Sequence, residues 1–201
     1  VEVARHGVAA DKITQSVHFV AQPDKTALLV QLIGQTSRAR SLVFARTKHG
    51  AERLMKQLDK QGFAVGSIHG NKSPGQRDRA LRALKAGDID ILVATDVAAR
   101  GIDIDGITHV YNYDLPNVAE NYVHRIGRTA RAGASGRAVA FCSPDEISEL
   151  KAIQKLLKAE ISVASGTPWE NLRPHKKPAG GQRKSRHRRR GRGSKPMKRA
   201  A

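Results

Sequence analysis

The chain has 201 residues, 39% of them apolar, and a mean hydropathy of −0.47, which suits one well-buried domain with some additional sequence. No apolar run approaches the roughly 18 residues that a membrane-crossing helix needs, and the first residues lack the apolar stretch of a secretory signal. We therefore predict a cytoplasmic protein that does not bind a membrane. A single cysteine, Cys142, excludes an internal disulfide, and its apolar surroundings predict a buried, inert thiol. We expect no metal site in the chain.

The net charge of +18 is concentrated near the C-terminus. Residues 173–201 hold 13 Lys and Arg and no Asp or Glu, which leaves a charge of about +5 for the preceding residues. This segment is rich in Gly, Pro and Arg, so we predict a disordered tail that binds polyanions through counterion release. We divide the chain into an N-terminal linker or extension (1–12), one folded domain (13–165) and the basic tail (166–201). Because the sequence begins without methionine, we expect it to be part of a longer protein.

Apolar, β-rich stretches alternate with amphipathic helical stretches along the folded part. Strands are predicted, in chain order, at residues 16–21, 41–45, 64–68, 90–95, 109–114 and 137–142. Helices are predicted at residues 24–35, from about 51 to 62, at 73–87 and from 143 to about 158. This alternation predicts a parallel sheet covered by helices. In such sheets ligands bind beyond the carboxyl ends of the strands, where most of the unusual residues lie.

Two of the predicted helices begin with capping signals. Ser73 precedes Pro74, and Gln76 follows three residues after Ser73, which is the pattern of a capping box. Gly87 marks the end of the same helix. The sequence Ser-Pro-Asp-Glu that begins at Ser143 repeats the start signal before the last predicted helix.

The segment HRIGRTARAG, which begins at His124, holds a histidine and three arginines in eight positions. In a helix, His124, Arg128 and Arg131 are spaced i, i+4 and i+7 and share one face. Two guanidinium groups on one face suit phosphate oxygens, because each is a planar fork of donors. A solvated surface helix is the competing interpretation, although Gly127 and Gly133 interrupt such a helix.

The segment ATDVAARGIDI directly follows the strand predicted at 90–95. It places Thr95 at the carboxyl end of that strand and closes on Gly101 and Asp103. A small hydroxyl, a glycine that permits close approach and a carboxylate suit a sugar–phosphate chain or a ribose hydroxyl. A plain strand-to-helix loop, with Asp103 as a turn or capping residue, is the alternative.

Two further segments carry polar side chains near predicted strand ends. In HGNKSPGQRDR, the capping box is a sufficient structural account of Gln76, and Arg79 lies one turn further along the same side of the helix. A solvated charge is the default interpretation of Arg79. In FARTKHG, Arg46, Thr47 and Lys48 follow the strand, and both phosphate contact and an exposed loop remain open.

Together and in this order, the four segments resemble motifs of the second RecA-like domain of DEAD-box RNA helicases. FARTK resembles motif IV, HG with QRDR resembles the glycine-containing loop and the Q-x-x-R segment, ATDVAARGID resembles motif V, and HRIGRTAR resembles motif VI. The resemblance covers roughly residues 10–160 and is almost letter for letter in motifs V and VI. It implies a RecA-like α/β fold of three layers, with a parallel sheet between two layers of helices.

Two details refine this resemblance. The histidine at position 124 favours the DEAD-box group over related helicases, and the residues around FARTKHG and IHGNKS resemble bacterial RhlE-type members. Ala130 stands where the family usually has glycine. Because alanine is a good helix former, we expect it to be tolerated there.

The resemblance implies a role for each candidate residue. Arg128 and Arg131 match arginine fingers that reach the γ-phosphate of ATP, where positive charge stabilises the phosphoryl-transfer transition state. His124 matches the histidine that bridges to the first domain, and Asp103, with Gly101 nearby, matches the carboxylate that binds the nucleotide ribose. The residues that match RNA-backbone contacts are Gly70, Gln76, Arg79 and Thr95, joined more weakly by Arg46 and Thr47. Two further arginines are expected to brace these loops, Arg100 and Arg125.

The sequence has neither the G-x-x-x-x-G-K-[ST] phosphate loop nor the Asp-Glu-Ala-Asp tetrapeptide. In the family these belong to the first domain, which holds the phosphates and Mg²⁺. The resemblance therefore implies half of an RNA-stimulated ATPase, with ATP as cofactor and with RNA and an N-terminal RecA-like domain as partners. This half alone is expected to be inactive. A stand-alone, non-catalytic RNA-binding or regulatory module is the alternative, and a basic structural protein of the ribosome or nucleoid type leaves the ordered motifs unexplained.

Overall fold

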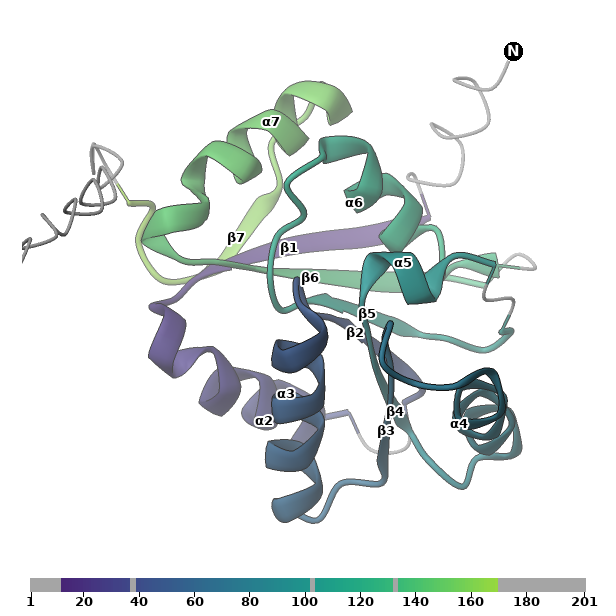
Figure 1. Cartoon of the computed structure of the whole chain (residues 1–201). Helices are drawn as coiled ribbons and strands as arrows, with labels where there is room; N and C mark the ends of the chain where they lie inside the picture. Colours follow the sequence, from purple (N-terminus) through teal and green to yellow (C-terminus); the bar gives the residue numbers. More distant parts are fainter. Residues whose placement is uncertain (1–11, 37–38, 102–103, 132–133, 170–201) are drawn as a thin grey trace, which may run out of the picture.

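The computed structural model describes residues 12–36, 39–101, 104–131 and 134–169 (Figure 1). The strands are β1 (Ile13–Phe19), β2 (Ser41–Phe44), β3 (Val65–Ile68), β4 (Ile91–Ala94), β5 (His109–Asn112), β6 (Gly136–Cys142) and β7 (Ser162–Ser165). The α-helices are α2 (Lys25–Gly34), α3 (Lys48–Lys60), α4 (Pro74–Ala86), α5 (Asp96–Ala99), α6 (Ala119–Ile126) and α7 (Ile147–Leu157), with 3-10 turns η1 (Gln22–Asp24) and η3 (Pro144–Glu146). Every strand and helix predicted in chain order is present, with ends shifted by a few residues. Within the described ranges, no helix has both the length and the apolar character that crossing a bilayer requires.

The strands form one parallel sheet in the order β3-β4-β2-β5-β6-β1-β7. All residues of β2 and β4 are buried, as expected for short apolar strands in the middle of a parallel sheet. The sheet therefore confirms the predicted fold class.

Helices cover both faces of the sheet, which gives three layers (Figure 1). On one face, α2 and α3 pack Leu29 and Leu54 against Val43 of β2. On the other face, α4 packs Leu84 against Leu42, the neighbour of Val43 in the same strand. The remaining helices, α5, α6 and α7, lie on this second face as well. Alternate side chains of a single strand thus enter two separate hydrophobic cores.

The predicted capping signals form as expected. The hydroxyl of Ser73 accepts the N–H of Gln76 at 3.3 Å, and Oε1 of Gln76 accepts the N–H of Ser73 at 2.9 Å. Gly62 and Gly87, which follow α3 and α4, have φ angles of +86° and +84°, in the left-handed region that favours glycine. These glycines end the two helices at little steric cost.

The C-terminal part of the fold adds a strand that the sequence pattern did not predict. All residues of β7 are exposed, so it lacks the apolar alternation that indicates a strand. Beyond β7, Nε1 of Trp169 donates to the carbonyl oxygen of Cys142, the last residue of β6, at 3.0 Å. Cys142 itself is 0% exposed, which confirms the predicted buried thiol, and burial raises its pKa to about 12. The predicted linker and tail fall largely outside the described residues, so those domain limits stay predictions.

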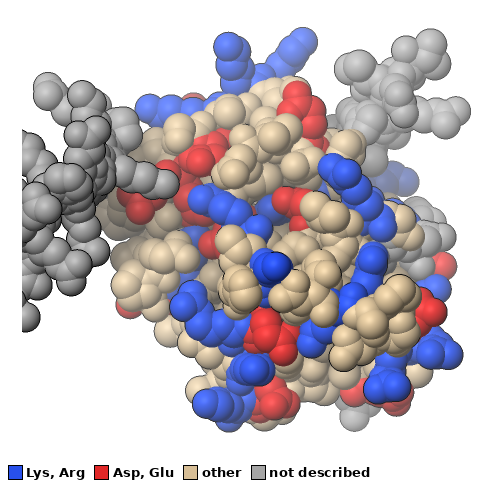
Figure 2. All heavy atoms as spheres, viewed as in Figure 1, with Lys and Arg blue, Asp and Glu red and all other residues tan. Residues whose placement is uncertain are grey.

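Basic side chains are widespread on the described surface (Figure 2). In this view, Lys and Arg occur across the face, including the part over α3 and α4, and Asp and Glu lie among them. On α3, His49, Arg53, Lys56 and Lys60 line an open groove together with Glu52. Such mixed charge is typical of a solvated face, so charge alone does not locate the functional site.

Candidate functional site at the carboxyl edge of the sheet

The predicted site segments follow strands that end at one edge of the sheet. Because β3, β4, β2 and β5 are parallel neighbours, their carboxyl ends lie together (Figure 1). The N–H of Thr95 donates to the carbonyl oxygen of Ile68 at 3.3 Å, which joins the ends of β4 and β3. The N–H of Asp114 donates to the carbonyl oxygen of Phe44 at 3.2 Å, which joins the ends of β5 and β2. The fold therefore brings the segments after these four strands to one place.

Arg125, on α6, ties several of these segments together. Its side chain is 2% exposed, and its guanidinium makes two bonds to Asp96, at 2.6 and 2.8 Å. The guanidinium also donates to Oδ1 of Asn112 at 3.0 Å and to the carbonyl oxygen of Asp114 at 2.7 Å. It lies 4.9 Å from the centre of the Phe44 ring, within the range of a cation–π contact. These contacts confirm the expectation that Arg125 braces the loops.

His124 and Arg128 line one cavity of about 280 Å³ beside this brace. Arg100 and Asp96 also line it. Because both carboxylate oxygens of Asp96 bond to Arg125, the carboxylate is balanced within the protein. The guanidinium groups of Arg100 and Arg128 on the lining suit an anion.

The helical geometry considered for HRIGRTARAG holds only as far as Ile126. α6 ends at Ile126, and Arg128 and Arg131 lie in the following turn instead of on the helix face of His124. Nε of Arg131 donates to the carbonyl oxygen of Gly127 at 3.2 Å, so Arg131 stays against the end of α6. The two arginines are thus placed by a turn, not by helical spacing.

A buried contact explains why the chain leaves helical geometry here. Oγ1 of Thr129 donates to the carbonyl oxygen of Ile107 at 2.5 Å, and a Cβ atom on Gly136 would lie only 2.9 Å from the backbone nitrogen of Ala130. Ala130 adopts φ +57°, a left-handed conformation that costs an L-residue other than glycine roughly 1–2 kcal/mol. Position 130 is therefore not helical, so helix propensity does not explain an alanine there, and its tolerance stays a prediction.

The segment after β4 is braced at both ends of α5, at its start by the bonds from Arg125 to Asp96. Thr95 is 8% exposed and is the N-cap of α5, although its side chain makes no capping hydrogen bond. At the other end, Nη2 of Arg77 donates to the carbonyl oxygen of Ala98 at 3.0 Å, a brace that the sequence analysis did not identify. Gly101 has φ +75°, so its backbone favours glycine. Asp103 lies outside the described residues, and its contact with a ribose stays a prediction.

The turn after β3 and the first turns of α4 carry three predicted RNA-binding residues. Gly70, Gln76 and Arg79 are all exposed. The capping box uses Oε1 of Gln76, which leaves the side-chain NH₂ as the group that can donate to a ligand. Gly70 has no positive φ, and a Cβ atom built on it meets nothing within 4 Å. The fold itself therefore does not require glycine at position 70.

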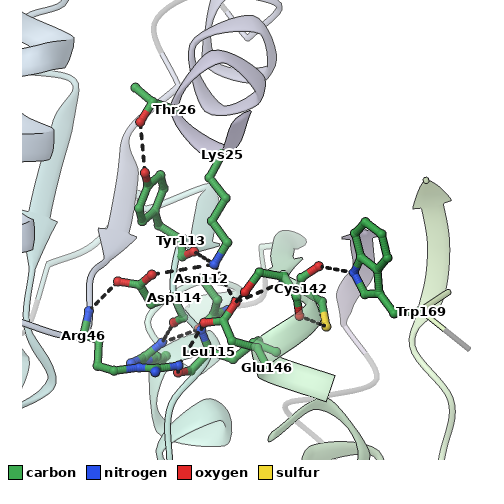
Figure 3. Close-up of polar contacts among 12 residues, drawn as sticks. Lys25, Thr26, Arg46, Asn112, Tyr113, Asp114, Leu115, Cys142, Glu146 and Trp169 are labelled. Atoms are coloured by element: carbon green, nitrogen blue, oxygen red, sulfur yellow. Dashed lines mark hydrogen bonds and ion pairs between the residues drawn. The ribbon is translucent and has the colours of Figure 1, made fainter. Parts of the chain in front are cut away.

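Arg46 and Thr47, after β2, both make bonds within the protein, and those of Arg46 are drawn in Figure 3. The Arg46 guanidinium donates to Oε1 of Glu146 at 2.9 Å and to the carbonyl oxygen of Leu115 at 3.1 Å. The backbone N–H of Arg46 donates to Oδ2 of Asp114 at 2.9 Å. The hydroxyl of Thr47 caps α3 by accepting a backbone N–H at 3.0 Å. Both residues thus have structural roles, and their contact with RNA stays a prediction.

A buried ionic network that the sequence analysis missed supports the same loops (Figure 3). Lys25, on α2, is 0% exposed, and its Nζ donates to Oε2 of Glu146 at 2.5 Å and to the carbonyl oxygen of Tyr113 at 2.8 Å. Asp114 lies 3.6 Å from the same Nζ. Glu146 is 3% exposed and also accepts the N–H of Leu115 at 3.0 Å. Lys25 and Glu146 are 121 residues apart in the chain, so no local pattern relates them.

Comparisons with known proteins agree with this geometry. The profile described as the helicase conserved C-terminal domain matches residues 24–133, just over half of the chain. The chain is 44% identical to the ATP-dependent RNA helicase RhlB of Vibrio parahaemolyticus, over 76% of this chain and 35% of that protein. The E. coli DEAD-box protein SrmB, in complex with regulator of ribonuclease activity A, superposes with a TM-score of 0.72 at 38% identity, over 75% of this chain and 89% of that one. S. cerevisiae Dbp5 bound to RNA and ADP BeF3 superposes with a TM-score of 0.72 at 35% identity, over 77% of this chain and 42% of that one.

The parallel sheet, with a basic cavity beyond its carboxyl edge, defines a RecA-like domain. The chain belongs to the helicase conserved C-terminal domain family, among the C-terminal domains of DEAD-box RNA helicases. This confirms the predicted family. The narrower resemblance to RhlE-type members stays a prediction. The chain spans only 29% of the length of the Listeria monocytogenes helicase CshA and 45% of that of the Shewanella piezotolerans helicase RhlB.

Proposed function

We propose that this chain is the C-terminal half of an ATP-dependent RNA helicase, which completes an ATP site held mainly by an N-terminal RecA-like domain and grips the RNA backbone. The observation that carries the proposal is the cavity in which His124 and Arg128 lie beside Asp96, the residue after Thr95. Residues predicted to face ATP and RNA thus meet at one edge of the sheet. The names of the relatives, which include ATP-dependent RNA helicases and a complex with RNA, support the same activity.

The cavity suits a nucleotide phosphate. Arg100 and Arg128 line it, and the carboxylate of Asp96, which would repel a phosphate, is paired with Arg125. ATP bound between two domains would supply the phosphoryl group that is transferred. Arg128 and Arg131 would stabilise the negative charge that develops on that group, as arginine fingers do.

The other half of the site would come from the N-terminal domain, which would hold the phosphates and Mg²⁺. On this chain, Asp103 and Gly101 would bind the ribose, and His124 would bridge to the N-terminal domain. Without that domain, the arginines have no nucleotide to act on. We therefore infer that residues 1–201 alone are inactive as an ATPase.

Gly70 supports an RNA contact at the same edge. Its surroundings are open and its backbone does not need glycine. We therefore infer that the ligand requires the absence of a side chain at this position. Gln76 and Arg79, on the adjacent helix, would donate to phosphates, and Thr95 would contact the sugar–phosphate chain. Such backbone contacts tolerate many sequences, and contacts with the 2′-hydroxyl favour RNA over DNA.

The basic tail would add salt-sensitive affinity for RNA in the cytoplasm. The bond from Trp169 to Cys142 holds the first residues of the predicted tail against the carboxyl end of β6, at the same edge of the sheet as the ends of β3 and β4. Deletion of residues 173–201 should flatten the salt dependence of RNA binding, because fewer counterions are released. If the dependence of RNA affinity on salt concentration is unchanged by the deletion, the tail does not tether RNA.

Reconstitution with the N-terminal domain of the same protein tests the central proposal. The chain alone should show no RNA-dependent ATP hydrolysis, and the added domain should restore it. Arg128→Ala or Arg131→Ala should then lower the restored rate by roughly 10³-fold or more. Arg137→Ala, an exposed arginine near the amino end of β6, is the matched control and should have no effect. RNA-dependent hydrolysis by the chain alone would contradict the proposal, and failure of restoration would favour a stand-alone RNA-binding module.

A further inference from the structure

The turn that follows β3 is shaped by its own histidine. The N–H of Lys72 donates to the carbonyl oxygen of His69 at 2.9 Å, and the N–H of Asn71 donates to Nδ1 of the His69 ring at 3.3 Å. His69 is 4% exposed, whereas Gly70 and Asn71 are exposed. A buried ring therefore sets the conformation of a turn whose tip faces the solvent.

Glu52, on α3, holds both ends of this turn through one oxygen atom. Its Oε2 lies 3.0 Å from Nε2 of His69 and 3.0 Å from Nζ of Lys72. It also accepts the hydroxyl of Ser67, in β3, at 2.9 Å. Because Nδ1 of His69 accepts the N–H of Asn71, the proton of the neutral ring lies on Nε2 and is donated to Glu52.

The carboxylate keeps its charge in this setting. The hydrogen bond from His69, together with those from Lys72 and Ser67, lowers the pKa of Glu52 to about 2, although burial acts in the opposite direction. Glu52 is therefore ionised at neutral pH, and its charge is balanced by Lys72.

We propose that Glu52 is a positioning residue for RNA binding: by holding His69 and Lys72, it presets the backbone of Gly70 and Asn71 without touching RNA itself. A turn that is ordered before binding does not lose backbone entropy when RNA arrives, so affinity rises without a new contact. This inference rests on the proposed function, because it takes the turn to be an RNA contact.

The direction in which RNA affinity changes when Glu52 is replaced separates a positioning role from simple electrostatic repulsion. A carboxylate near RNA repels phosphate groups, so loss of its charge alone should tighten binding. Loss of positioning should weaken binding. Asp59, an exposed carboxylate further along α3, offers a matched control, because Asp59→Asn removes the same charge but leaves the turn intact.

The experiment is a titration of the ¹⁵N-labelled chain with a single-stranded oligouridylate, in which affinity is read at the amides of Gly70 and Asn71. These amides detect RNA at the turn, and because every variant keeps the same tail, the contribution of the tail to affinity cancels in the comparison. Glu52→Ala should weaken binding about tenfold, the equivalent of newly ordering one backbone residue. Glu52→Gln, which keeps an acceptor for His69, should be intermediate, and Asp59→Asn should bind as the wild type or slightly more tightly.

Two further measurements keep the test decisive. Long-range ¹H–¹⁵N spectra should show the His69 proton on Nε2 in the wild type and in Glu52→Gln, and mixed tautomers in Glu52→Ala. If Glu52→Ala does not fold, Glu52→Gln should still weaken RNA binding, whereas Asp59→Asn should not. Gly70→Ala should weaken binding, and Gly34→Ala, at a similarly open glycine in α2, should not.

If Glu52→Ala binds RNA as tightly as the wild type or more tightly while Gly70→Ala weakens binding, the positioning role is wrong and the RNA contact stands. If Gly70→Ala also has no effect, the proposed RNA contact at this turn fails, and the positioning role fails with it.

Discussion

Lys25→Met and Glu146→Gln each remove one partner of the same buried ion pair, yet they should lower the free energy of unfolding by different amounts. Without Lys25, Glu146 keeps the guanidinium of Arg46 at 2.9 Å and three further hydrogen-bond donors. Without the charge of Glu146, Lys25 stays fully buried beside the carbonyl oxygen of Tyr113, with only Asp114 at 3.6 Å to balance it. The lysine is therefore the partner that is left in the worse environment.

Removal of one partner of a buried ion pair typically costs roughly 3–5 kcal/mol, because the other charge is left unbalanced. We expect Glu146→Gln to fall in that range. Lys25→Met should cost about 2 kcal/mol, because Arg46 still balances Glu146. The double variant should lose less than the sum of the two, with a coupling of roughly 1–2 kcal/mol.

Urea unfolding followed by far-UV circular dichroism measures these values, provided that the slope of free energy against urea is the same for each variant. Fluorescence of Trp169, the single tryptophan, gives a second probe near this network. Arg137→Gln, outside the network, should change the stability by less than about 0.5 kcal/mol. Equal losses for the two single variants, or a larger loss for Lys25→Met, would refute the reasoning that Arg46 shares Glu146.

One further substitution and one chemical reaction test features of the local geometry. Ala130→Gly should raise the free energy of unfolding by about 1 kcal/mol in the same urea assay, because glycine adopts φ +57° without the steric cost. The greater entropy of glycine in the unfolded chain offsets only part of that gain. A decrease in the free energy of unfolding would show that the turn does not strain alanine. Cys142, whose pKa is raised to about 12 by burial, should react with iodoacetamide at pH 8 at least roughly 10³-fold more slowly in the native protein than in urea, as measured by mass spectrometry. Equal rates would mean that the thiol is accessible in the folded state.

The fold could be predicted where the signals are local. The start and end of α4 depend on Ser73, Gln76 and Gly87, whose chemistry acts on their own chain neighbours. The end of α6 depends instead on the bond from Thr129 to Ile107, two residues that are 22 positions apart. Helical spacing cannot reveal such a contact, so the shared helix face considered for His124, Arg128 and Arg131 does not form.

The site could be predicted only as a set of residue types. Arg125 and Arg128 are indistinguishable in the sequence HRIGR, yet the first is buried against Asp96 and the second lines the cavity. The family resemblance, not the spacing, separated these two roles. No local signal pointed to Lys25 and Glu146, because they are 121 residues apart and their contact depends on how the folded sheet brings distant segments together.

Within the described residues, the segments at the carboxyl edge that make the contacts below have one physical property in common: each is held by a charged group with several hydrogen bonds. Arg125 holds α5 and the end of β5, Glu146 holds the segments after β2 and β5, and Glu52 holds the turn after β3. Such groups are costly to separate from their partners, so the loops are already ordered before any ligand binds. In the proposed function this edge meets a second domain and an RNA strand at the same time, and each loop ordered in advance reduces the conformational entropy lost at that step. A braced edge can therefore hold RNA through a few backbone contacts, as recognition without sequence preference requires.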